Sequence, residues 1–349
     1  MAGGSGERFW PRSRRAYPKP LLRVVDDESL LEATLRRAHR VAPPERTWIV
    51  ATGENVAPIR ALAQLPRGHV LVEPTGRNTA MAVGFAAVRL AAEDPDAVLA
   101  ILPADHVIPD ARTHASALRR AAKAAADGAL VTLGVKPTRP DPGYGYIQRG
   151  APIGRAHPGL YRVRRFVEKP TAARARGYLR RGGYLWNAGI FVWRASAILE
   201  EIERWAPDLH RALAPIRACP SGRGSRVARE RAYRRAPSLP IDVAVMERSD
   251  RVWTQPVDFH WSDVGNWASL AQELGVTART SHVLGGEAIL EDSPGNLVFA
   301  GDRLVALLGV EGLAVIDAGD ALLVTRLERS GDVKRVVSRL RESRRQDLL

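Results

Sequence analysis

The chain opens with a glycine-rich stretch, AGGSGERFWPRSRRAYPKPLL, whose residues can bind a phosphate group. Gly3, Gly4 and Gly6 leave backbone N–H groups free to approach an anion without interference from side chains. Arg8 and Lys19 can then neutralise the charge of the phosphate. A flexible Gly/Ser tail is the alternative, but a tail has no reason to continue into a pattern of aromatic residue, proline and lysine. The stretch is therefore typical of a phosphate-binding loop.

Two aspartates are candidate ligands for a divalent cation. Asp105 ends the apolar stretch AVLAILPAD, where a carboxylate would face the ligand crevice of an α/β sheet. Asp263 stands in WSDVGNW, and an Asx turn beside Gly265 is its alternative. A turn-capping role is likewise the alternative for Asp105. His106 is expected to support the ligand residues or to pack, rather than to bind the metal itself. Two oxygen ligands without a histidine or cysteine cluster argue against zinc.

A third group of candidates can bind hydroxyl groups. Asn187 in WNAGIF offers donors and acceptors, and Gly145 in GYGYI lets the backbone approach a ligand closely. Glu168 and Lys169 follow an apolar stretch in VEKP, where the polar end of an edge strand is the alternative interpretation.

The segment EPTGRNTA places amide and hydroxyl groups at the start of an apolar helical stretch. Such a cluster, with Glu73, Arg77, Asn78 and Thr79, can read the edge of a purine while the helix N-terminus faces anionic groups. A helix capped by Asn78 or Thr79 after a turn is the alternative, and both can hold at once.

The elements that must position these residues follow from hydrophobic periodicity. Between residues 29 and 135, helical and strand patterns alternate, and Ser29 and Glu32 have the spacing of a capping box. Strands are predicted at 46–52, 69–74, 97–106 and 129–135, and helices at 29–43, 54–65, 78–94 and 111–127. Apolar strands alternating with helices predict a doubly wound parallel sheet with ligands at the carboxyl ends of its strands.

The remainder of the chain has different hydrophobic patterns. Residues 143–265 mix strand and helix patterns, with helices expected near 195–217 and 225–236. After about residue 280, short apolar runs punctuated by Gly, Asp and Asn predict a small all-β unit, followed by a basic helix.

Composition excludes several classes of protein. The 349 residues carry a net charge of +14, but the excess is nearly all arginine, spread along the chain, which indicates a compositional bias. Basic stretches at 223–237 and 335–346 have the spacing of solvated helix faces. No run reaches the roughly 18 apolar residues of a membrane span, and no signal peptide is recognisable. Cys219 is the single cysteine, so a cytoplasmic location is expected.

Taken together, these motifs resemble the sugar nucleotidyltransferases. The opening stretch resembles their G-G-x-G-x-R…P-K-P signature, and VEPTGRNTAMA is similar to the nucleotide-binding segment of the mannose-1-phosphate guanylyltransferases. Further motifs follow in family order from residue 2 to about 327: LPADH, KPTRPDPGYGYI, VEKP, WNAGIFVW, IDVAVMER and DFHWSDVGNW.

This resemblance implies both fold and activity. It implies an α/β, Rossmann-like nucleotidyltransferase domain with a central mixed sheet flanked by helices over 1–275. A small C-terminal β domain over 280–327 and a basic helix over 328–349 follow. The implied reaction transfers GMP from GTP to α-D-mannose 1-phosphate, giving GDP-mannose and pyrophosphate. The sugar phosphate attacks the α-phosphorus in line, assisted by Mg²⁺ or Mn²⁺.

The resemblance also implies roles for individual residues. The catalytic residues would be Arg8, Lys19, Asp105, Lys169 and Asp263. The metal would be held by Asp105 and Asp263. The nucleotide would contact Ala2, Gly3, Gly4, Gly6, Glu73, Arg77, Asn78 and Thr79. The sugar phosphate would contact Gly145, Glu168, Lys169 and Asn187.

Other functions stay open. Another nucleotide and sugar phosphate, such as thymidylyl or adenylyl transfer to glucose 1-phosphate, would keep the same chemistry. A catalytically silent regulatory homologue is the second alternative. No nucleic-acid or membrane partner and no phosphomannose isomerase activity are expected, and a homodimer is the candidate assembly.

Two positions depart from the family pattern. Pro240 replaces a serine in the S-I-D-x-A-V-M-E motif, and a helix is still expected to start near Asp242. The family has an apolar strand before A-G-G, where this sequence has only Met1 before Ala2. The first strand is therefore expected to be missing, with translation starting upstream.

Overall fold

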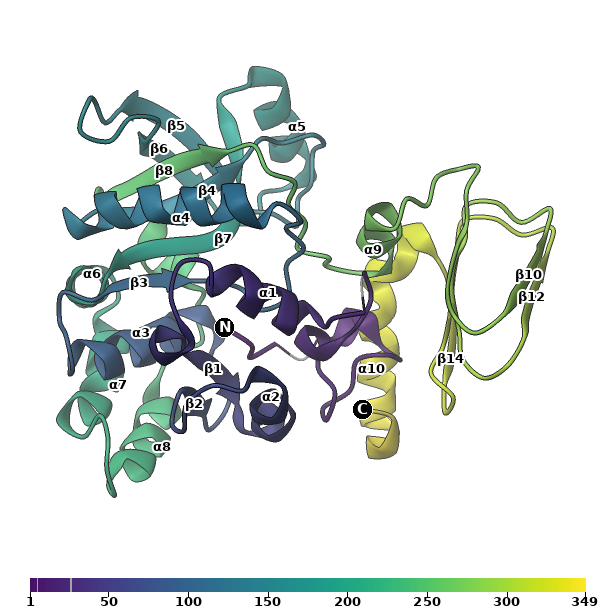
Figure 1. Ribbon diagram of the computed structural model, residues 1–349, viewed down its shortest axis with the longest axis horizontal. Helices are drawn as coiled ribbons and strands as arrows, with labels where there is room; N and C mark the ends of the chain where they lie inside the picture. The colour runs from purple at the N-terminus through teal and green to yellow at the C-terminus, as the bar shows by residue number, and fades with distance from the viewer. Residues whose placement is uncertain (5, 26) are drawn as a thin grey trace.

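The structure is a computed structural model that describes residues 1–4, 6–25 and 27–349 (Figure 1). Ser5 of the glycine-rich stretch lies outside the described residues. A large α/β domain occupies one end of the long axis and a small β domain the other, with α10 between them.

The strands of the large domain are β1 (Ile49–Thr52), β2 (Val70–Glu73), β3 (Val98–Ile101), β4 (Leu130–Val135), β5 (Tyr146–Pro152), β6 (Tyr161–Val167), β7 (Tyr184–Arg194) and β8 (Val252–Val257). Its helices are α1 (Leu30–Ala38), α2 (Val56–Ala63), α3 (Asn78–Ala91), α4 (Ala111–Ala126), α5 (Ala172–Arg181), α6 (Ala195–Trp205), α7 (Pro207–Ala218), α8 (Ser225–Arg235) and α9 (Trp267–Glu273).

The main sheet is mixed and has the strand order β3-β7-β4-β8-β6-β5. β4 and β8 are parallel, whereas β7 is antiparallel to both β3 and β4. The expectation of a central mixed sheet is therefore confirmed, but the parallel pairing expected among the strands up to residue 135 is wrong for β3. The physical reason is the long apolar β7, which inserts between β3 and β4 and separates two strands that follow each other in the chain.

Helices cover both faces of this sheet. α3 and α6 pack with Leu185 and Trp193 of β7, and α4 packs with Trp186 and Val192 of the same strand. Side chains of a strand alternate between its faces, so β7 contributes to both cores. This alternation also separates Asn187 from Trp186, its neighbour in the chain.

Two helix starts show how local sequence fixes these elements. The capping box predicted for α1 is confirmed, because Ser29 and Glu32 exchange side-chain and backbone hydrogen bonds. The carboxylate of Asp110 accepts from the N–H groups of Arg112 and Thr113 and caps α4. Asp110 lies five residues beyond Asp105, so the start of α4 is fixed close to the candidate site.

β1 and β2 form a separate parallel sheet of two strands. The amino end of the chain lies between this sheet and β3 (Figure 1). There, the N–H of Ala2 donates to Val50 of β1, and Met1 bonds to Leu102 and Ala104 just beyond β3. Met1 and Ala2 are thus the only residues of the described chain that link the two sheets by backbone hydrogen bonds at this point.

The small domain winds parallel strands around a compact core. Its strands are β9 (His282–Gly285), β10 (Ala288–Glu291), β11 (Leu297–Ala300), β12 (Val305–Leu308), β13 (Leu313–Asp317) and β14 (Leu322–Arg326). β11 pairs in parallel with β9 and β13, and β10 with β12. α10 (Val333–Glu342) lies within the range expected for the C-terminal helix. Phe299 and Val337 share one hydrophobic cluster with Phe9 and Trp267, which joins the small domain to the segment after the glycine-rich stretch.

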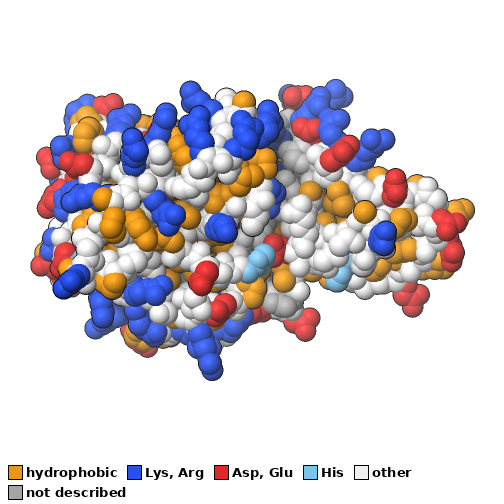
Figure 2. Space-filling view, turned by 90° about the horizontal axis from the view of Figure 1, so that it is seen from above, with side chains coloured by type: hydrophobic (Ala, Val, Ile, Leu, Met, Phe, Trp, Pro, Cys, Tyr) orange, Lys and Arg blue, Asp and Glu red, His pale blue; other side chains and the backbone are white. Residues whose placement is uncertain are grey.

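The face seen in Figure 2 carries charges of both signs. On the face in Figure 2, arginine and lysine side chains are scattered among acidic and hydrophobic ones. Over residues 1–4, 6–25 and 27–349, the helices are too short or too polar to cross a bilayer.

Candidate active site

The glycine-rich stretch leaves the gap between β1 and β3 and passes the carboxyl end of β2. A Cβ atom at Gly3 would lie 3.0 Å from Oε2 of Glu73, whereas a Cβ at Gly4 would meet no atom within 4 Å. Gly6 has a φ of +63°, and a Cβ there would lie 2.5 Å from the Cβ of Lys19. Only glycine fits at position 6, because any side chain would displace the backbone that supports Lys19.

Lys19 joins the two candidate aspartates. Its ammonium donates to Oδ2 of Asp105 at 2.8 Å and to the backbone carbonyl of Asp263 at 2.6 Å. Burial alone would raise the pKa of Asp105, but the Lys19 ammonium beside it holds that pKa below its usual range. The structure therefore brings three of the predicted catalytic residues together, with the Asp105 carboxylate ionised beside a buried cation.

Asp263 is held by a residue that the sequence interpretation missed. The hydroxyl of Tyr144 donates to Oδ1 of Asp263 at 3.0 Å. Within the described chain, Oδ2 accepts no hydrogen bond. The Arg139 guanidinium lies over the rings of Tyr144 and Trp186, with ring centres 5.7 and 5.3 Å away. The place of Tyr144 beside Gly145 in GYGYI was the one signal that could have identified it.

His106 packs edge-on against Trp261. Its Nδ1 accepts a hydrogen bond from the indole N–H of Trp261 at 3.1 Å. Burial lowers the pKa of His106 to about 4, so its imidazole is neutral at pH 7. Four tryptophans of the large domain are buried and are therefore unavailable as stacking platforms for a nucleic acid: Trp186, Trp193, Trp261 and Trp267.

The candidates for hydroxyl binding converge around Asn187. Its backbone N–H donates to the carbonyl of Gly145 at 2.8 Å. A Cβ at Gly145 would lie 2.7 Å from Oε2 of Glu168, so a side chain at this position would collide with the carboxylate. The amide nitrogen of Asn187 donates to Asp242, and its oxygen accepts from Thr132. Tyr144 and Gly145 are consecutive, so this group adjoins the Lys19 group through one peptide bond.

Asp242 is the second residue that the sequence interpretation missed as part of the site. It is buried, and desolvation followed by the nearby Glu168 carboxylate raises its pKa to about 7. The helix expected near Asp242 is a short π-helical turn over Asp242–Met246, and Ala244 bonds back to the carbonyl of Pro240. The IDVAVMER motif was the available signal, but the pattern alone indicated a helix start rather than a carboxylate facing Asn187.

Two predicted cations lie at the surface. The Lys169 side chain is 63% exposed, and its ammonium donates to Oε1 of Glu168 at 2.8 Å. Lys169 also has a φ of +45°, which is uncommon outside glycine. Arg8 is exposed and forms no hydrogen bond or ion pair within residues 1–4, 6–25 and 27–349. The structure thus pairs Lys169 with Glu168, whereas the Arg8 side chain has no hydrogen-bond or ion-pair partner among the described residues.

Glu73 carries an unusual charge state at the end of β2. Its side chain is 4% exposed, and Oε1 accepts from the hydroxyl of Tyr233 at 3.1 Å. Burial raises the pKa of Glu73 to about 7, against the smaller opposing effects of Tyr233 and the amino group of Met1. A buried carboxyl that is half-protonated near neutral pH therefore lies beside Gly3.

The rest of the predicted nucleotide segment is fixed by backbone contacts. Arg77 donates to the carbonyl of Tyr233, and the hydroxyl of Thr79 accepts from the N–H of Ile241 at 2.8 Å. Asn78 has a φ of +63°, and its side-chain oxygen accepts from Thr79. α3 has no side-chain cap at its N-terminus, so neither Asn78 nor Thr79 serves as the expected N-cap.

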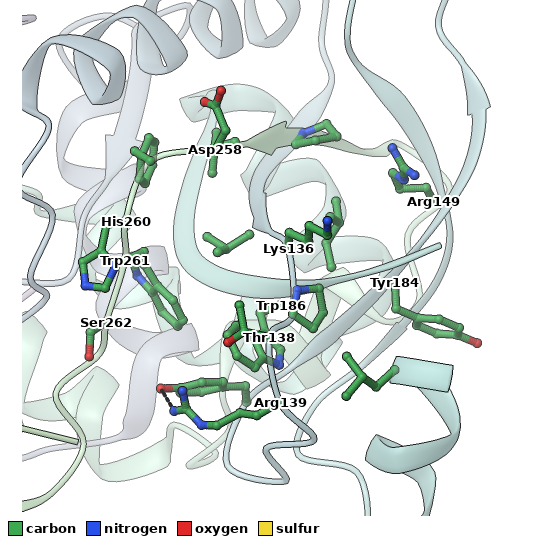
Figure 3. A pocket seen from close by; sticks show the side chains of 18 of the residues that line it. Lys136, Thr138, Arg139, Arg149, Tyr184, Trp186, Asp258, His260, Trp261 and Ser262 are labelled. Carbon is green, nitrogen blue, oxygen red and sulfur yellow. Dashed lines mark hydrogen bonds between the residues drawn. The ribbon is translucent and has the colours of Figure 1, made fainter. Parts of the chain in front are cut away.

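A cleft of about 1350 Å³ opens on the α4 side of the sheet and contains none of the predicted site residues (Figure 3). Its lining includes Lys136, Arg139, Trp186 and Trp261. Trp186 and Asn187 point to opposite faces of β7, so this cleft lies behind the sheet from Asn187. Tyr144 is shared, since it lines the cleft and donates to Asp263.

Asp105 and Asp263 suit a hard divalent cation. No group of three or more His, Cys, Asp and Glu side chains that could enclose a metal occurs within the part of the chain that the structure describes. An ionised Asp105 and the open Oδ2 of Asp263 supply two carboxylate oxygens instead. Mg²⁺ typically takes one or two carboxylates and completes its shell with water and substrate phosphates, so the donor set fits it.

Comparisons with known proteins cover the whole chain. A family model described as "Nucleotidyl transferase" matches residues 1–278, and one described as "MannoseP isomerase/GMP-like beta-helix domain" matches residues 286–340. The chain is 36% identical to the mannose-1-phosphate guanylyltransferase of Klebsiella pneumoniae, over 99% of this chain and 74% of that protein. It is 37% identical to the alginate biosynthesis protein AlgA of Pseudomonas aeruginosa, over 97% of this chain and 71% of that protein.

A solved structure agrees with these matches. The crystal structure described as a mannose-1-phosphate geranyltransferase from Thermus thermophilus superposes with a TM-score of 0.88 at 38% identity. The match covers 98% of both chains. The α/β domain and the C-terminal β domain therefore occur together in a known relative.

Proposed function

The chain belongs to the mannose-1-phosphate guanylyltransferase family, and we propose that its site transfers GMP from GTP to α-D-mannose 1-phosphate. The products are GDP-mannose and pyrophosphate. The observation that carries the proposal is the placement of Lys19 on both Asp105 and Asp263, in a chain that matches a named guanylyltransferase over 99% of its length.

The reaction joins two anions, so charge neutralisation and positioning supply most of the catalysis. A phosphate oxygen of the sugar phosphate attacks the α-phosphorus of GTP, and the bond to the β-phosphate oxygen breaks to release pyrophosphate. No proton has to move in this step. Lys19 supplies positive charge beside the loop of Gly3 and Gly4, whose N–H groups can receive phosphate oxygens. The exposed side chains of Arg8 and Lys169 would contact the triphosphate and the sugar phosphate, with Lys169 oriented by Glu168.

Asp105 and Asp263 would hold Mg²⁺ or Mn²⁺. When bound, the cation would neutralise phosphate charge and draw the two substrates into line. Tyr144 orients the Asp263 carboxylate through its hydroxyl, and Lys19 keeps Asp105 ionised. Tyr144 and Lys19 thus both prepare oxygen ligands for the cation, and the Lys19 ammonium also supplies positive charge to the phosphates.

The two ends of the site recognise different groups. Asn187, with Glu168 and the backbone of Gly145, offers donors and acceptors that suit the hydroxyls of a hexose. Arg77, Asn78 and Thr79 lie at the start of α3, beside Glu73, where the base and the anionic groups of the nucleotide would bind. A homodimer, a cytoplasmic location and the absence of nucleic-acid or membrane partners stay predictions of the sequence.

Pyrophosphate release by the purified chain tests the proposal. Each of GTP, ATP, UTP and dTTP is combined with mannose 1-phosphate or glucose 1-phosphate in the presence of Mg²⁺. We expect GTP with mannose 1-phosphate to give the highest kcat/KM. A matched variant, Asp105→Asn with Asp263→Asn, keeps the shape of the site and should abolish the signal.

Three results would contradict the proposal in different ways. Release with another pair at a higher kcat/KM would retain the chemistry and change the substrates. Equal release by the double variant would place the reaction elsewhere. Tight binding of nucleotide without turnover by any pair would favour a regulatory homologue.

A further inference from the structure

Arg37 is a buried cation that the proposed reaction does not use. It lies near the end of α1, which packs against α4 (Figure 1), and it is 4% exposed. Its Nη2 atom donates to the hydroxyl of Thr34 at 2.7 Å and to the backbone carbonyl of His106 at 2.9 Å. Within residues 1–4, 6–25 and 27–349, Arg37 forms no ion pair. Two neutral oxygens therefore hold its charge.

Burial makes this charge costly. Desolvation lowers the pKa of Arg37 to about 10, so the guanidinium is still protonated at neutral pH but is less stable than in water. The nearby His114 of α4 is also buried, and its pKa is lowered to about 4 by burial and by the Arg37 charge. An alkyl side chain would fill the same space without a buried charge. The packing of α1 against α4 therefore does not by itself account for an arginine at this position.

The peptide group that Arg37 holds is also bonded on its opposite edge. The carbonyl of His106 and the N–H of Val107 belong to one planar peptide group. This N–H donates to the carbonyl of Ser262 at 2.9 Å, and the N–H of Ser262 donates back to the carbonyl of Val107 at 3.1 Å. Arg37 thus bonds one edge of the peptide plane and Ser262 bonds the other. The plane cannot rotate without breaking one of these hydrogen bonds.

This peptide group lies between the two candidate metal ligands. Asp105 directly precedes His106, and Asp263 directly follows Ser262. The indole N–H of Trp261 adds a further link between the two segments through Nδ1 of His106. The aspartates therefore belong to two short segments that are hydrogen-bonded to each other. The position of the shared peptide plane affects how far apart their carboxylates lie.

The backbone of the Asp105 segment depends on Arg37 more than on any other side chain. In the part of the chain that the structure describes, Arg37 is the only side chain that bonds the backbone of residues 105–108. The Asp263 segment has two such supports, since Lys19 donates to the carbonyl of Asp263 and the hydroxyl of Ser262 accepts from the N–H two residues later. Loss of Arg37 would therefore release the Asp105 segment alone.

We propose that Arg37 is a positioning residue of the cation site. Its guanidinium holds the peptide after His106 and thereby keeps Asp105 at the separation from Asp263 that a divalent cation requires. The inference rests on the proposed function, because Arg37 acts through the cation that these carboxylates would hold. Arginine suits the task, since its planar fork fixes the direction of its hydrogen bonds, whereas lysine offers a flexible point charge.

Binding of GTP with and without Mn²⁺, in the absence of sugar phosphate, tests this role without turnover. Isothermal titration calorimetry gives both Kd values. Their ratio measures how much the cation strengthens GTP binding, and Asp105→Asn provides the ratio that remains when a metal ligand is lost. Arg37→Met removes the guanidinium and keeps an alkyl stem, and Arg37→Lys keeps the charge without the fork. Thr34→Val is the matched control, because it removes the other partner of Arg37 and leaves the bond to His106.

We expect Arg37→Met to lower the ratio about tenfold, because groups that orient metal ligands contribute about 10–100-fold to metal affinity. Arg37→Lys should lower it by about threefold, and Thr34→Val should leave it within about twofold of the parent. The Kd of GTP without Mn²⁺ should be the same in all four chains. The Tm of Arg37→Met should stay close to that of the parent, since the loss of a hydrogen bond is offset by the removal of a buried charge.

An unchanged ratio in Arg37→Met would overturn the proposal. An equal fall in Thr34→Val would also overturn it, because the effect would then come from the packing of α1 rather than from the bond to His106. If Arg37→Met does not fold, a parental ratio in Arg37→Lys is the result that overturns it. A parent whose ratio is no larger than that of Asp105→Asn would instead reject the cation site, and the proposed function with it.

Discussion

Asp105 and Asp242 lie in two parts of the site, and their pKa values are shifted in opposite directions. At the Lys19 end, an ammonium 2.8 Å from Asp105 holds that carboxyl ionised. At the Asn187 end, Asp242 is held by a neutral amide and its pKa is raised to about 7. Asp242 is buried, whereas the Asp105 side chain is 31% exposed. The difference therefore comes both from the Lys19 ammonium beside Asp105 and from the deeper burial of Asp242.

The opposite pKa shifts of Asp105 and Asp242 match the two kinds of group that a sugar nucleotidyltransferase binds. Phosphates and divalent cations require permanent charge, which Lys19 secures by keeping its partner ionised. Hydroxyl groups require donors and acceptors in fixed directions, and a permanently charged carboxylate is unnecessary for that. The Asn187 end can therefore respond to pH near neutrality, whereas the Lys19 end stays charged.

Removal of a charged oxygen ligand should have the largest effect. Asp263→Ala is expected to lower kcat/KM about a thousandfold, because it deletes a carboxylate that would hold the cation, and single electrostatic groups of active sites contribute about 10²–10³. Pyrophosphate release at saturating Mg²⁺ measures the loss. Asp258→Ala, an exposed aspartate five residues earlier, is the matched control. A loss below tenfold for Asp263→Ala would remove this residue from the catalytic group.

Neutralisation of the buried cation should be nearly as damaging. Lys19→Gln leaves Asp105 without its ammonium, so the pKa of Asp105 should rise and kcat should fall about a hundredfold. Lys334→Gln, an exposed lysine of α10, is the control. The pH profile of kcat provides the second readout, and an unchanged acid limb would contradict the role assigned to Lys19.

The Asn187 end should affect binding more than turnover. Asp242→Asn is expected to raise the KM for mannose 1-phosphate about tenfold, which corresponds to the loss of roughly one charge-assisted hydrogen bond to Asn187. The KM for GTP should stay within about twofold. A fall in kcat with unchanged KM would instead place Asp242 beside the reacting atoms. The regions around Lys19 and Asn187 would then not differ in function as proposed.

Tyr144→Phe should have a smaller effect, because it removes the hydroxyl that orients Asp263 and leaves the ring in place. We expect kcat to fall about tenfold, which is the loss of roughly one hydrogen bond to a carboxylate. The apparent Mg²⁺ affinity should weaken in parallel. Tyr184→Phe, another aromatic residue of the α4 cleft, should leave both constants unchanged.

The last prediction concerns stability rather than rate. Glu73 binds a proton more tightly in the folded chain, where its pKa is about 7, than in the unfolded chain, where it is near 4.5. The folded state therefore holds more protons between pH 4.5 and 7, and this contribution to the free energy of unfolding is lost as pH rises through about 7. Glu73→Gln removes that dependence, so the difference in unfolding free energy between variant and parent should grow by up to about 3 kcal/mol across this window. Denaturant unfolding at several pH values measures it, and parallel curves would contradict it.

Short-range patterns predicted many elements correctly and failed where distant segments meet. The Ser29–Glu32 capping box was readable because both partners lie within one helical turn. The antiparallel insertion of β7 between β3 and β4 was not, since it joins residues about 50–60 positions apart in β4 and about 90–96 positions apart in β3 and leaves no periodic signal. The same holds for Tyr144 and Asp263, which are 119 positions apart.

The sequence by itself determined the residue types at the site, the alternation of helix and strand, and the resemblance to the family, because local propensity and motif spacing are written along the chain. Only the tertiary structure decided which charges meet: Lys19 on Asp105, Tyr144 on Asp263 and Asn187 on Asp242. It also decided that Glu73 and Asp242 hold their protons near neutrality. Burial and partner charge set a pKa, and both are properties of the folded chain rather than of its residues.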